Sequence, residues 1–253
     1  LYNSVMLRMN GTIAISNFIH DHIKKNYSFK KNPIQTIERG IDLNFFDPMS
    51  ISKNDIKNAI KKYDLKEDSI KILLPARVTE WKGHLTLIDA VSQLLEKKIL
   101  NIEVLFFGPD QNKLLKEKIK NSIRHKNLQH IIKFYGPSDK MNLIYALSDI
   151  VVSSSTDPEA FGRVSIEAQA MGKLIIASAH GGSQETIIEG KTGYLYSPKE
   201  PSELMKKISS VIDQKKYCSN EMSSLAIEHI KSNYGKDKMC KKTLEFYQEI
   251  ISQ

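Results

Sequence analysis

Short runs of residues that are apolar on both faces of an extended chain alternate with segments of helical periodicity. The runs predicted as strands are Lys71–Ala76, Ile102–Gly108, Ile131–Gly136, Asp149–Ser155 and Lys173–Ala179. Strands that bury both faces are typical of a parallel sheet covered by helices on both sides. The repeated strand–helix units therefore predict a doubly wound, Rossmann-like α/β domain, with ligands at the carboxyl ends of its strands.

Apolar residues three and four apart predict the helices between these strands, at residues 85–95, 114–123 and 141–148. The two ends of the chain do not belong to that repeat. Before it we expect a strand, a helix, a second strand and a linker, at residues 11–16, 17–25, 33–38 and 47–48. After it we expect helices at residues 201–213 and 217–232 and a final helix from residue 236.

The composition is that of a folded chain, with 41% hydrophobic and 26% charged residues among 253. The longest run without Asp, Glu, Lys or Arg is residues 9–20, which is too short for a membrane-spanning helix. Cys218 and Cys240 lack metal-ligand spacing, so we expect free thiols in a reducing cytoplasm and no zinc site.

The net charge of +8 favours a phosphate-bearing partner, such as a nucleotide, a nucleic acid or an anionic lipid. A solvated basic surface is the alternative explanation. Only 5 of the 37 basic residues are Arg, the residue that best reads phosphates and bases. A nucleic-acid binder would also need a basic face with stacked aromatic side chains, whereas the aromatic residues lie mainly in predicted strands.

The most informative stretch is residues 157–167, which follows a predicted strand and leads into a helix. The backbone N–H groups around Phe161 and Gly162 would lie unpaired at the N-terminus of that helix, a place that attracts phosphate. Beside a diphosphate, Glu159 and Glu167 would suit recognition of hydroxyl groups. The alternative is a helix start with ordinary acidic residues.

Two further loops follow predicted strands. Arg77 and Lys82 lie after the first strand of the repeat, where two cations could neutralise a leaving diphosphate. The alternative there is a pair of surface charges beside a glycine turn. Residues 180–185, His-Gly-Gly-Ser-Gln-Glu, either cradle a ligand or form a tight turn with helix capping. Neither a GxGxxG nor a GxxxxGK[ST] pattern occurs, so dinucleotide and P-loop sites lose their main support.

Taken together, these stretches resemble the donor-binding half of the retaining GT-B glycosyltransferases of the group 1 family (family four). Six motifs of that family occur in order and in register between residues 35 and 200. They are the G-[IV]-D-x-x-x-F-x-P linker at 40–48, R-x4-KG at 77–83, E-x7-E at 159–167, EA-x-A-x-G at 167–172, GG-x-x-E at 181–185 and G-x-x-G-[YF]-L at 190–195.

The resemblance implies roles for these residues. Arg77 and Lys82 would hold the donor diphosphate and stabilise the leaving group, while Glu159 would contact the donor sugar. Glu167 would bind the ribose hydroxyls, and the loop after residue 134 would meet the base. The implied substrate-binding residues are Glu167, Phe161, Gly162, Tyr135, Gly136, Pro137, Gly181 and Gly182. The family needs no metal, so no metal ion or other cofactor is expected.

Three positions depart from the family pattern. Arg39 stands where Asn is common before the glycine, Ser154 stands where Pro is common, and Gly108–Pro109 replaces the usual G-x-G.

A complete enzyme of this kind has two Rossmann-like domains with the active site between them, and here the N-terminal domain would be mostly missing. Residues 1–47 are predicted to be the end of that acceptor-side domain. Residues 48–235 would form the nucleotide-sugar domain, and residues 236–253 a helix that packs back toward the N-terminal domain.

Three hypotheses remain open. The first is a glycosyltransferase, or its donor-binding half, that transfers a sugar from a UDP- or GDP-linked donor to a glycan or lipid-linked acceptor in cell-envelope polysaccharide or lipopolysaccharide synthesis. It would lie in the cytoplasm, with peripheral contact to an anionic membrane. The second is a truncated, non-catalytic fragment that binds a nucleoside diphosphate. The third, a nucleic-acid binder, rests on charge alone.

Overall fold

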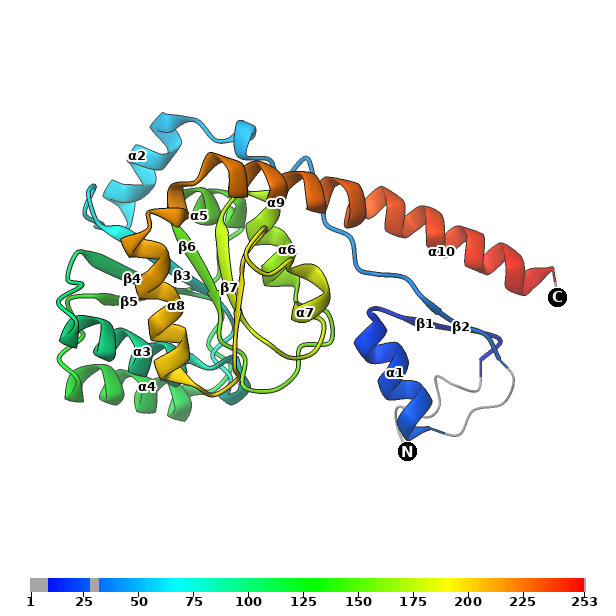
Figure 1. Ribbon diagram of the computed structural model, residues 1–253, viewed down its shortest axis with the longest axis horizontal. Coiled ribbons are helices and arrows are strands. Elements are labelled where there is room, and N and C mark those ends of the chain that lie inside the picture. The colour runs from blue at the N-terminus through cyan, green and yellow to red at the C-terminus, as the bar shows by residue number, and fades with distance from the viewer. Residues whose placement is uncertain (1–8, 28–31, 253) are drawn as a thin grey trace.

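The main body of the protein is a six-stranded, entirely parallel sheet with the strand order β5-β4-β3-β6-β7-β8. The computed structural model describes residues 9–27 and 32–252 (Figure 1). The strands are β3 (Ile70–Pro75), β4 (Ile102–Phe107), β5 (Ile132–Tyr135), β6 (Ile150–Ser153), β7 (Leu174–Ser178) and β8 (Tyr194–Tyr196). The predicted doubly wound parallel sheet is confirmed.

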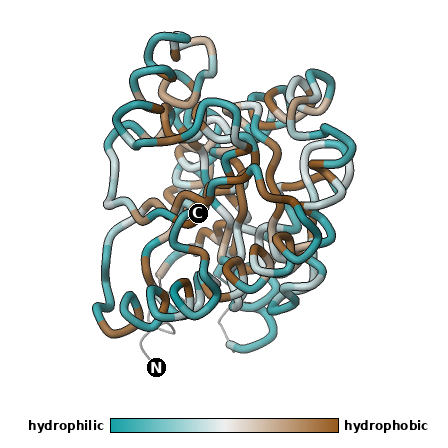
Figure 2. The backbone as a smooth tube through the Cα atoms, turned by 90° about the vertical axis from the view of Figure 1, so that its left-hand side faces the viewer, coloured by the Kyte–Doolittle hydropathy of each residue, from teal (hydrophilic) through white to brown (hydrophobic). Residues whose placement is uncertain are grey.

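Helices cover both faces of the sheet (Figure 1). One face packs against α3 (His84–Glu96), α4 (Lys113–His125) and α8 (Pro201–Asp213). The other packs against α2 (Lys53–Lys62), α5 (Met141–Leu147), α6 (Arg163–Ala170) and α9 (Asn220–Asn233). Successive strand residues point to opposite faces, so Ile72 and Leu74 enter one hydrophobic core and Leu73 enters the other. Figure 2 shows the resulting apolar interior within a polar exterior.

Two elements were not expected from the sequence, α2 and β8. Helix α2 begins with a capping box, in which Ser52 Oγ accepts from the Asp55 backbone N–H and the Asp55 carboxylate accepts from the Ser52 backbone N–H, at 3.1 and 3.0 Å. Strand β8 is only three residues long and lies at the edge of the sheet, where a short apolar run carries little periodicity.

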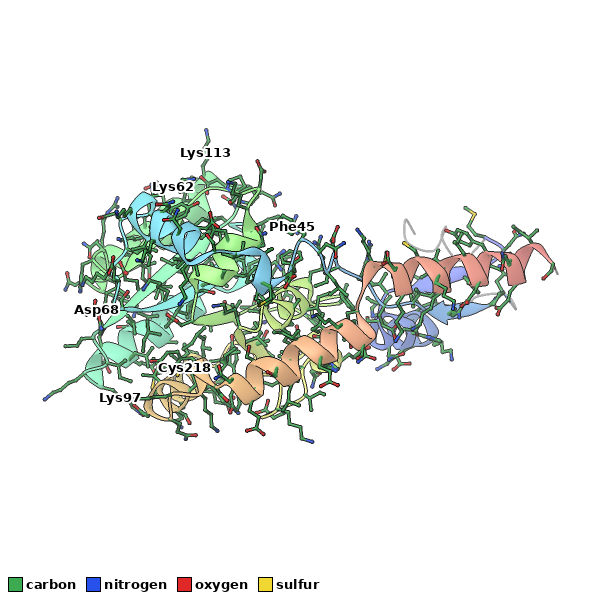
Figure 3. The ribbon with its side chains drawn as sticks, turned by 90° about the horizontal axis from the view of Figure 1, so that it is seen from above. Phe45, Lys62, Asp68, Lys97, Lys113 and Cys218 are labelled. Carbon is green, nitrogen blue, oxygen red and sulfur yellow. The ribbon has the colours of Figure 1, made fainter. Side chains whose placement is uncertain are left out.

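The N-terminal segment lies to one side of the main body (Figure 1). It consists of β1 (Thr12–Ala14), α1 (Asn17–Asn26) and β2 (Ile34–Thr36), with β1 and β2 paired in parallel. The last helix, α10 (Lys236–Ile251), extends from the main body along this segment (Figures 1 and 3). The contact is close, because a Cβ added to Gly11 would lie 2.3 Å from Ile250 Cδ1.

The remaining short elements are α7 (Ser183–Thr186) and the 3₁₀ turns η2 (Pro48–Ser50), η3 (Glu80–Lys82) and η4 (Lys216–Cys218). Both cysteines are free, as expected from their spacing, and both are exposed; Cys218 is labelled in Figure 3. Among the described residues, no helix is both long enough and apolar enough to cross a membrane.

The strand order reverses between β3 and β6, because the chain adds strands outward from β3 in one direction and outward from β6 in the other. The loops that follow these two neighbouring strands leave the carboxyl edge of the sheet on opposite sides. This divergence opens a crevice, which is where ligands bind in open α/β sheets.

Candidate functional site

A cavity of about 440 Å³ lies at this reversal point, and we call it the switch-point cavity. Its walls come from the loop after β3, from the loop between β6 and α6 with the first residues of α6, and from the N-terminal segment with the stretch that follows β2. The lining residues are Ile15, Arg39, Arg77, Trp81, Lys82, Glu159, Ala160, Phe161, Gly162, Arg163 and Val164. The structure thus brings together five residues that the sequence analysis selected, which are Arg77, Lys82, Glu159, Phe161 and Gly162.

Lys82 and Glu159 form an ion pair inside the cavity, with 2.5 Å between Nζ and Oε1 and 13% of each side chain exposed. Ser155 Oγ donates to the same carboxylate oxygen at 2.6 Å. The carbonyl of Ser155 lies 2.8 Å from His180 Nε2, so His180 supports this arrangement from outside the cavity. Lys82 Nζ also lies 4.2 Å from the centre of the Trp81 ring. The Glu159 side chain is therefore held on two sides.

The loops after β3 and β6 are bonded directly to each other. The Thr156 N–H donates to the Trp81 carbonyl at 2.7 Å, and Ser154 Oγ lies 3.0 Å from the Gly83 carbonyl. A Cβ added to Gly83 would lie only 1.7 Å from the Ser154 carbonyl oxygen, and Gly83 has a φ of +68°. Serine at position 154, which departs from the family pattern, thus supplies a hydroxyl that ties the Lys82 loop to its neighbour.

The glycine turn at residues 181–182 supports the site through its backbone. The Gly182 N–H donates to the Glu159 carbonyl at 2.8 Å. A Cβ on Gly181 would lie 2.3 Å from that same carbonyl oxygen, and a Cβ on Gly182 would lie 2.5 Å from Phe161 Cα. Neither glycine lines the switch-point cavity. The structure therefore explains both glycines as the means by which the two loops approach, and their predicted substrate contact stays a prediction.

Helix α6 points its N-terminus into the cavity. Its first flanking residue, Gly162, has a φ of +87° and provides no side-chain cap. The Ser165 N–H already donates to the Gly162 carbonyl at 3.0 Å. The N–H groups of Arg163 and Val164, which have no partner among the described residues, are therefore the ones available to an anion, and the helix dipole favours negative charge there. The Phe161 side chain is buried and packs edge-on against Tyr234 with 5.8 Å between ring centres, so only the backbone of Phe161 can meet a ligand.

Glu167 lies one turn inside α6 and does not line the cavity itself. Its carboxylate accepts from Tyr145 Oη and from Arg163 Nη2, each at 2.8 Å, and Arg163 does line the cavity. Burial raises the pKa of the Glu167 carboxyl, and the two hydrogen bonds and the Arg163 charge oppose that shift only in part. Each carboxylate oxygen keeps a further lone pair for a hydroxyl donor.

Tyr135, Gly136 and Pro137, which were predicted to meet the base, line a different cavity of about 620 Å³. We call it the α2 cavity, because helix α2 forms one wall of it. Tyr135 stacks on Phe107 with 4.6 Å between ring centres and donates its hydroxyl to the Tyr63 carbonyl at 2.7 Å. Burial raises the pKa of this phenol to about 12. The two cavities share no lining residue.

The N-terminal segment contacts the candidate site through residues that the sequence analysis did not select. Ser16 Oγ donates to the Ala160 carbonyl at 2.6 Å. The Glu185 carboxylate accepts from the backbone N–H groups of Asn17 and Phe18, at 2.9 and 2.7 Å. Glu185 is the last residue of the GG-x-x-E motif, so a signal existed for it, but its partner lies more than 160 positions away.

The part of the chain that the structure describes contains no group of three or more His, Cys, Asp or Glu side chains placed to hold a metal ion.

Comparison with known proteins places this geometry in a family. A family model described as "Glycosyl transferases group 1" matches residues 55–226, which include every loop of the sheet domain that reaches the switch-point cavity. The chain belongs to the group 1 glycosyltransferase family.

The similarity to known proteins covers nearly the whole chain. Spore coat protein SA of Bacillus subtilis (strain 168) is 26% identical over 247 residues, which are 94% of this chain and 64% of that protein. A glycosyltransferase from Rickettsia africae ESF-5 superimposes with a TM-score of 0.90 and 35% identity, covering 99% of this chain and 66% of that one. The fold is also that of Anabaena Alr3699/HepE in complex with UDP and glucose, with a TM-score of 0.88, 23% identity and coverage of 97% and 65%. This group 1 glycosyltransferase chain thus spans less than two thirds of the length of the relative first named.

Proposed function

We propose that this chain is the donor-binding half of a retaining glycosyltransferase that takes a sugar from a UDP- or GDP-linked donor. One observation carries the proposal: at the reversal of the strand order, Arg77, Lys82 and a helix N-terminus without a side-chain cap meet around one cavity. A diphosphate is the group that such an arrangement binds best.

The donor diphosphate lies between Arg77, Lys82 and the start of α6. The Lys82 ammonium has three donors, of which one serves Glu159 and another faces the Trp81 ring. The third is free for a phosphate oxygen. When the bond from the anomeric carbon to the diphosphate breaks, the bonding electrons leave with the phosphate oxygen. Arg77 and Lys82 stabilise this charge, and that stabilisation is larger in the transition state than in the ground state.

Glu159 acts on the sugar. Lys82 and Ser155 fix its carboxylate close to the place where the diphosphate bond breaks. A carboxylate in that position orients the sugar through its hydroxyl groups and stabilises positive charge at the anomeric carbon. The acceptor hydroxyl then bonds to the anomeric carbon on the face that the diphosphate leaves, and its proton passes to the departing phosphate oxygen, so the configuration is retained.

The nucleoside extends away from the cation pair. Glu167 accepts the ribose hydroxyls through the lone pairs that Tyr145 and Arg163 leave unused. The base reaches toward the loop of Tyr135, Gly136 and Pro137 at the mouth of the α2 cavity. The titratable carboxyl of Glu167 must be ionised for this role, which links donor binding to pH.

The acceptor in this proposal is a glycan or a lipid-linked saccharide of the cell envelope, and transfer requires no metal ion or other cofactor. The net charge of +8 supports peripheral binding to the anionic inner face of the cell membrane from the cytoplasm. No contact with nucleic acid forms part of the proposal.

Calorimetric titration with UDP, GDP and ADP tests the proposal directly. One of the first two should bind, and adding EDTA should leave its affinity unchanged. If none of the three nucleotides binds, the assignment of the switch-point cavity as a donor site fails. If chelation abolishes binding, the metal-free mechanism fails while the donor site stands.

A further inference from the structure

Arg39 is a cation of the switch-point cavity that the diphosphate does not require. It lies between β2 and the main body, and its side chain is exposed and lines the cavity. Arg77, Lys82 and the start of α6 already offer a diphosphate two cations and free N–H groups. Arg39 belongs instead to the wall that the N-terminal segment contributes, together with Ile15.

The backbone on both sides of Arg39 is fixed by helix α10. The Glu38 carboxylate accepts from Lys242 Nζ at 2.8 Å. The Gly40 N–H lies 3.2 Å from Met239 Sδ, and a Cβ on Gly40 would lie 2.6 Å from Lys236 Cα, so the chain runs directly against the helix. The packing of its neighbours against α10 therefore fixes the backbone at Arg39 beside the cavity that its side chain lines.

The guanidinium group itself has no partner among the described side chains. No carboxylate of residues 9–27 or 32–252 lies within ion-pair distance of Arg39, whereas Arg163 is paired with Glu167. A guanidinium that lines a cavity from a fixed stretch of backbone and has no carboxylate partner keeps its donors available to an anionic ligand.

The choice of arginine is also informative. The chain has 5 Arg among 37 basic residues, and three of those five, Arg39, Arg77 and Arg163, line this one cavity. Arginine presents five donors in a planar fork that matches the two oxygens of a carboxylate or a phosphate, and lysine does not. A cavity that needed only positive charge would draw on the lysines that dominate elsewhere.

We propose that Arg39 binds a second anionic group of the substrates, a carboxylate or a phosphate that is separate from the donor diphosphate. This group belongs either to the transferred sugar or to the acceptor. The inference rests on the proposed function, because it assigns Arg77 and Lys82 to the diphosphate.

Paired probes that differ only in charge test the inference. The donor arm compares UDP-glucose with UDP-glucuronate. The acceptor arm compares glucose with glucose 1-phosphate, added to protein saturated with UDP. If GDP is the nucleotide that binds, GDP-mannose, GDP-mannuronate and GDP replace the uridine compounds. The variants are Arg39→Gln and Arg39→Lys, with Arg124→Gln as control, because Arg124 is an exposed arginine on α4 outside the cavity.

In one arm the anionic probe should bind wild-type protein at least tenfold more tightly than its neutral partner. Arg39→Gln should remove that preference while changing the affinity for UDP less than twofold. Arg39→Lys should retain part of the preference, and Arg124→Gln all of it. The arm that responds identifies whether the sugar or the acceptor carries the anion.

Four results would overturn the inference. Two of them are anionic probes that bind no more tightly than the neutral ones in both arms, and a preference that survives in Arg39→Gln. A tenfold loss of UDP affinity in Arg39→Gln would show that Arg39 serves the diphosphate instead. If UDP, GDP and ADP all fail to bind wild-type protein, the proposed function falls, and this inference falls with it.

Discussion

The two cavities of the sheet domain differ in chemistry more than in size. Each contains a lysine beside an aromatic ring, Lys82 at 4.2 Å from the centre of Trp81 and Lys62 at 5.1 Å from the centre of Tyr63. The switch-point cavity is lined by four basic side chains and one carboxylate beside a helix N-terminus without a side-chain cap, whereas the larger α2 cavity is lined by two lysines and two aspartates. Charge arrangement, and not volume, therefore marks the candidate active site.

The walls of the two cavities also differ in how tightly they are built. Around the switch-point cavity, added Cβ atoms on Gly83, Gly181 and Gly182 would all lie within 2.5 Å of neighbouring backbone atoms. In the α2 cavity, a Cβ on Gly136 would meet nothing within 4 Å. A site that must place a carboxylate against a reacting bond gains from loops that cannot shift, because small displacements cost catalytic rate.

The largest predicted effect is a loss of folding stability when alanine replaces a glycine of the tightly packed loops. Gly83→Ala should destabilise the protein by at least about 3 kcal/mol, because it forces an alanine into a left-handed conformation against the Ser154 carbonyl. Gly136→Ala should change stability by less than about 0.5 kcal/mol. Denaturant unfolding of both variants checks the pair. Equal losses would show that the loops of the two cavities are equally constrained.

The second prediction concerns how the free energy of unfolding depends on pH, and it rests on His84, which follows the Lys82 loop in the sequence. His84 is buried and has no hydrogen-bond partner among the described residues, and burial, aided by the Lys82 charge, lowers its pKa to about 4. The unfolded chain takes up this proton near pH 6.5, whereas the folded protein does not. The free energy of unfolding should therefore fall by on the order of 3 kcal/mol as the pH drops from 6.5 to 4.

His84→Leu provides the control for this pH dependence. The variant keeps an apolar side chain in the buried site and loses the titrating group, and all other ionisable groups remain common to both proteins. The unfolding free energy of the wild type minus that of the variant should therefore decrease as the pH falls from 7 to 4. A difference that does not vary with pH would exclude His84 as the titrating group.

A smaller effect separates the two glutamates. Glu167→Gln should weaken UDP or GDP binding by about 1–2 kcal/mol, because it replaces the ionised acceptor of the ribose hydroxyls. Glu159→Gln should leave nucleotide binding nearly intact and should reduce transfer in the complete two-domain enzyme. Calorimetry tests the first variant and steady-state kinetics the second. Loss of nucleotide binding in Glu159→Gln alone would reverse the two assignments.

The pH profile of donor binding sharpens the same distinction. Burial raises the pKa of Glu167, so wild-type affinity for the nucleotide should increase as the pH rises above the ordinary glutamate value and the carboxyl ionises. Glu167→Gln should show no such increase in that range. A rise of equal size in the variant would assign the titration to another group.

Most of the fold could be predicted from the sequence, because buried parallel strands are local apolar runs. Strands β3, β4 and β7 begin or end within one residue of their predicted positions, and α8 matches at both ends. Helix α2 was not predicted, although the capping box of Ser52 and Asp55 is a sequence signal for its start. Strand β8 was missed because its three residues acquire their structure from pairing with β7, which is not encoded locally.

The candidate site was predictable in part, because the strands that carry its loops are local apolar runs. Arg77, Lys82 and Glu159 follow predicted strands, and parallel strands deliver their loops to one edge. Ser155 and Arg39 were not selected, because their roles depend on distant packing. Ser155 donates a hydrogen bond to the Glu159 carboxylate, and Arg39 lies between two residues that contact α10. Neither relation has a signature in local spacing.

Titration with inorganic pyrophosphate tests the central claim most directly, because it presents the diphosphate without base or sugar. The proteins to compare are wild type, Lys82→Ala and Lys62→Ala, which remove the matched lysines of the two cavities. Lys82→Ala should weaken pyrophosphate binding at least about tenfold, the scale of a hydrogen bond to a charged group, and Lys62→Ala should change it less than about twofold. A loss in Lys62→Ala that equals or exceeds the loss in Lys82→Ala would contradict the assignment of the switch-point cavity as the diphosphate site.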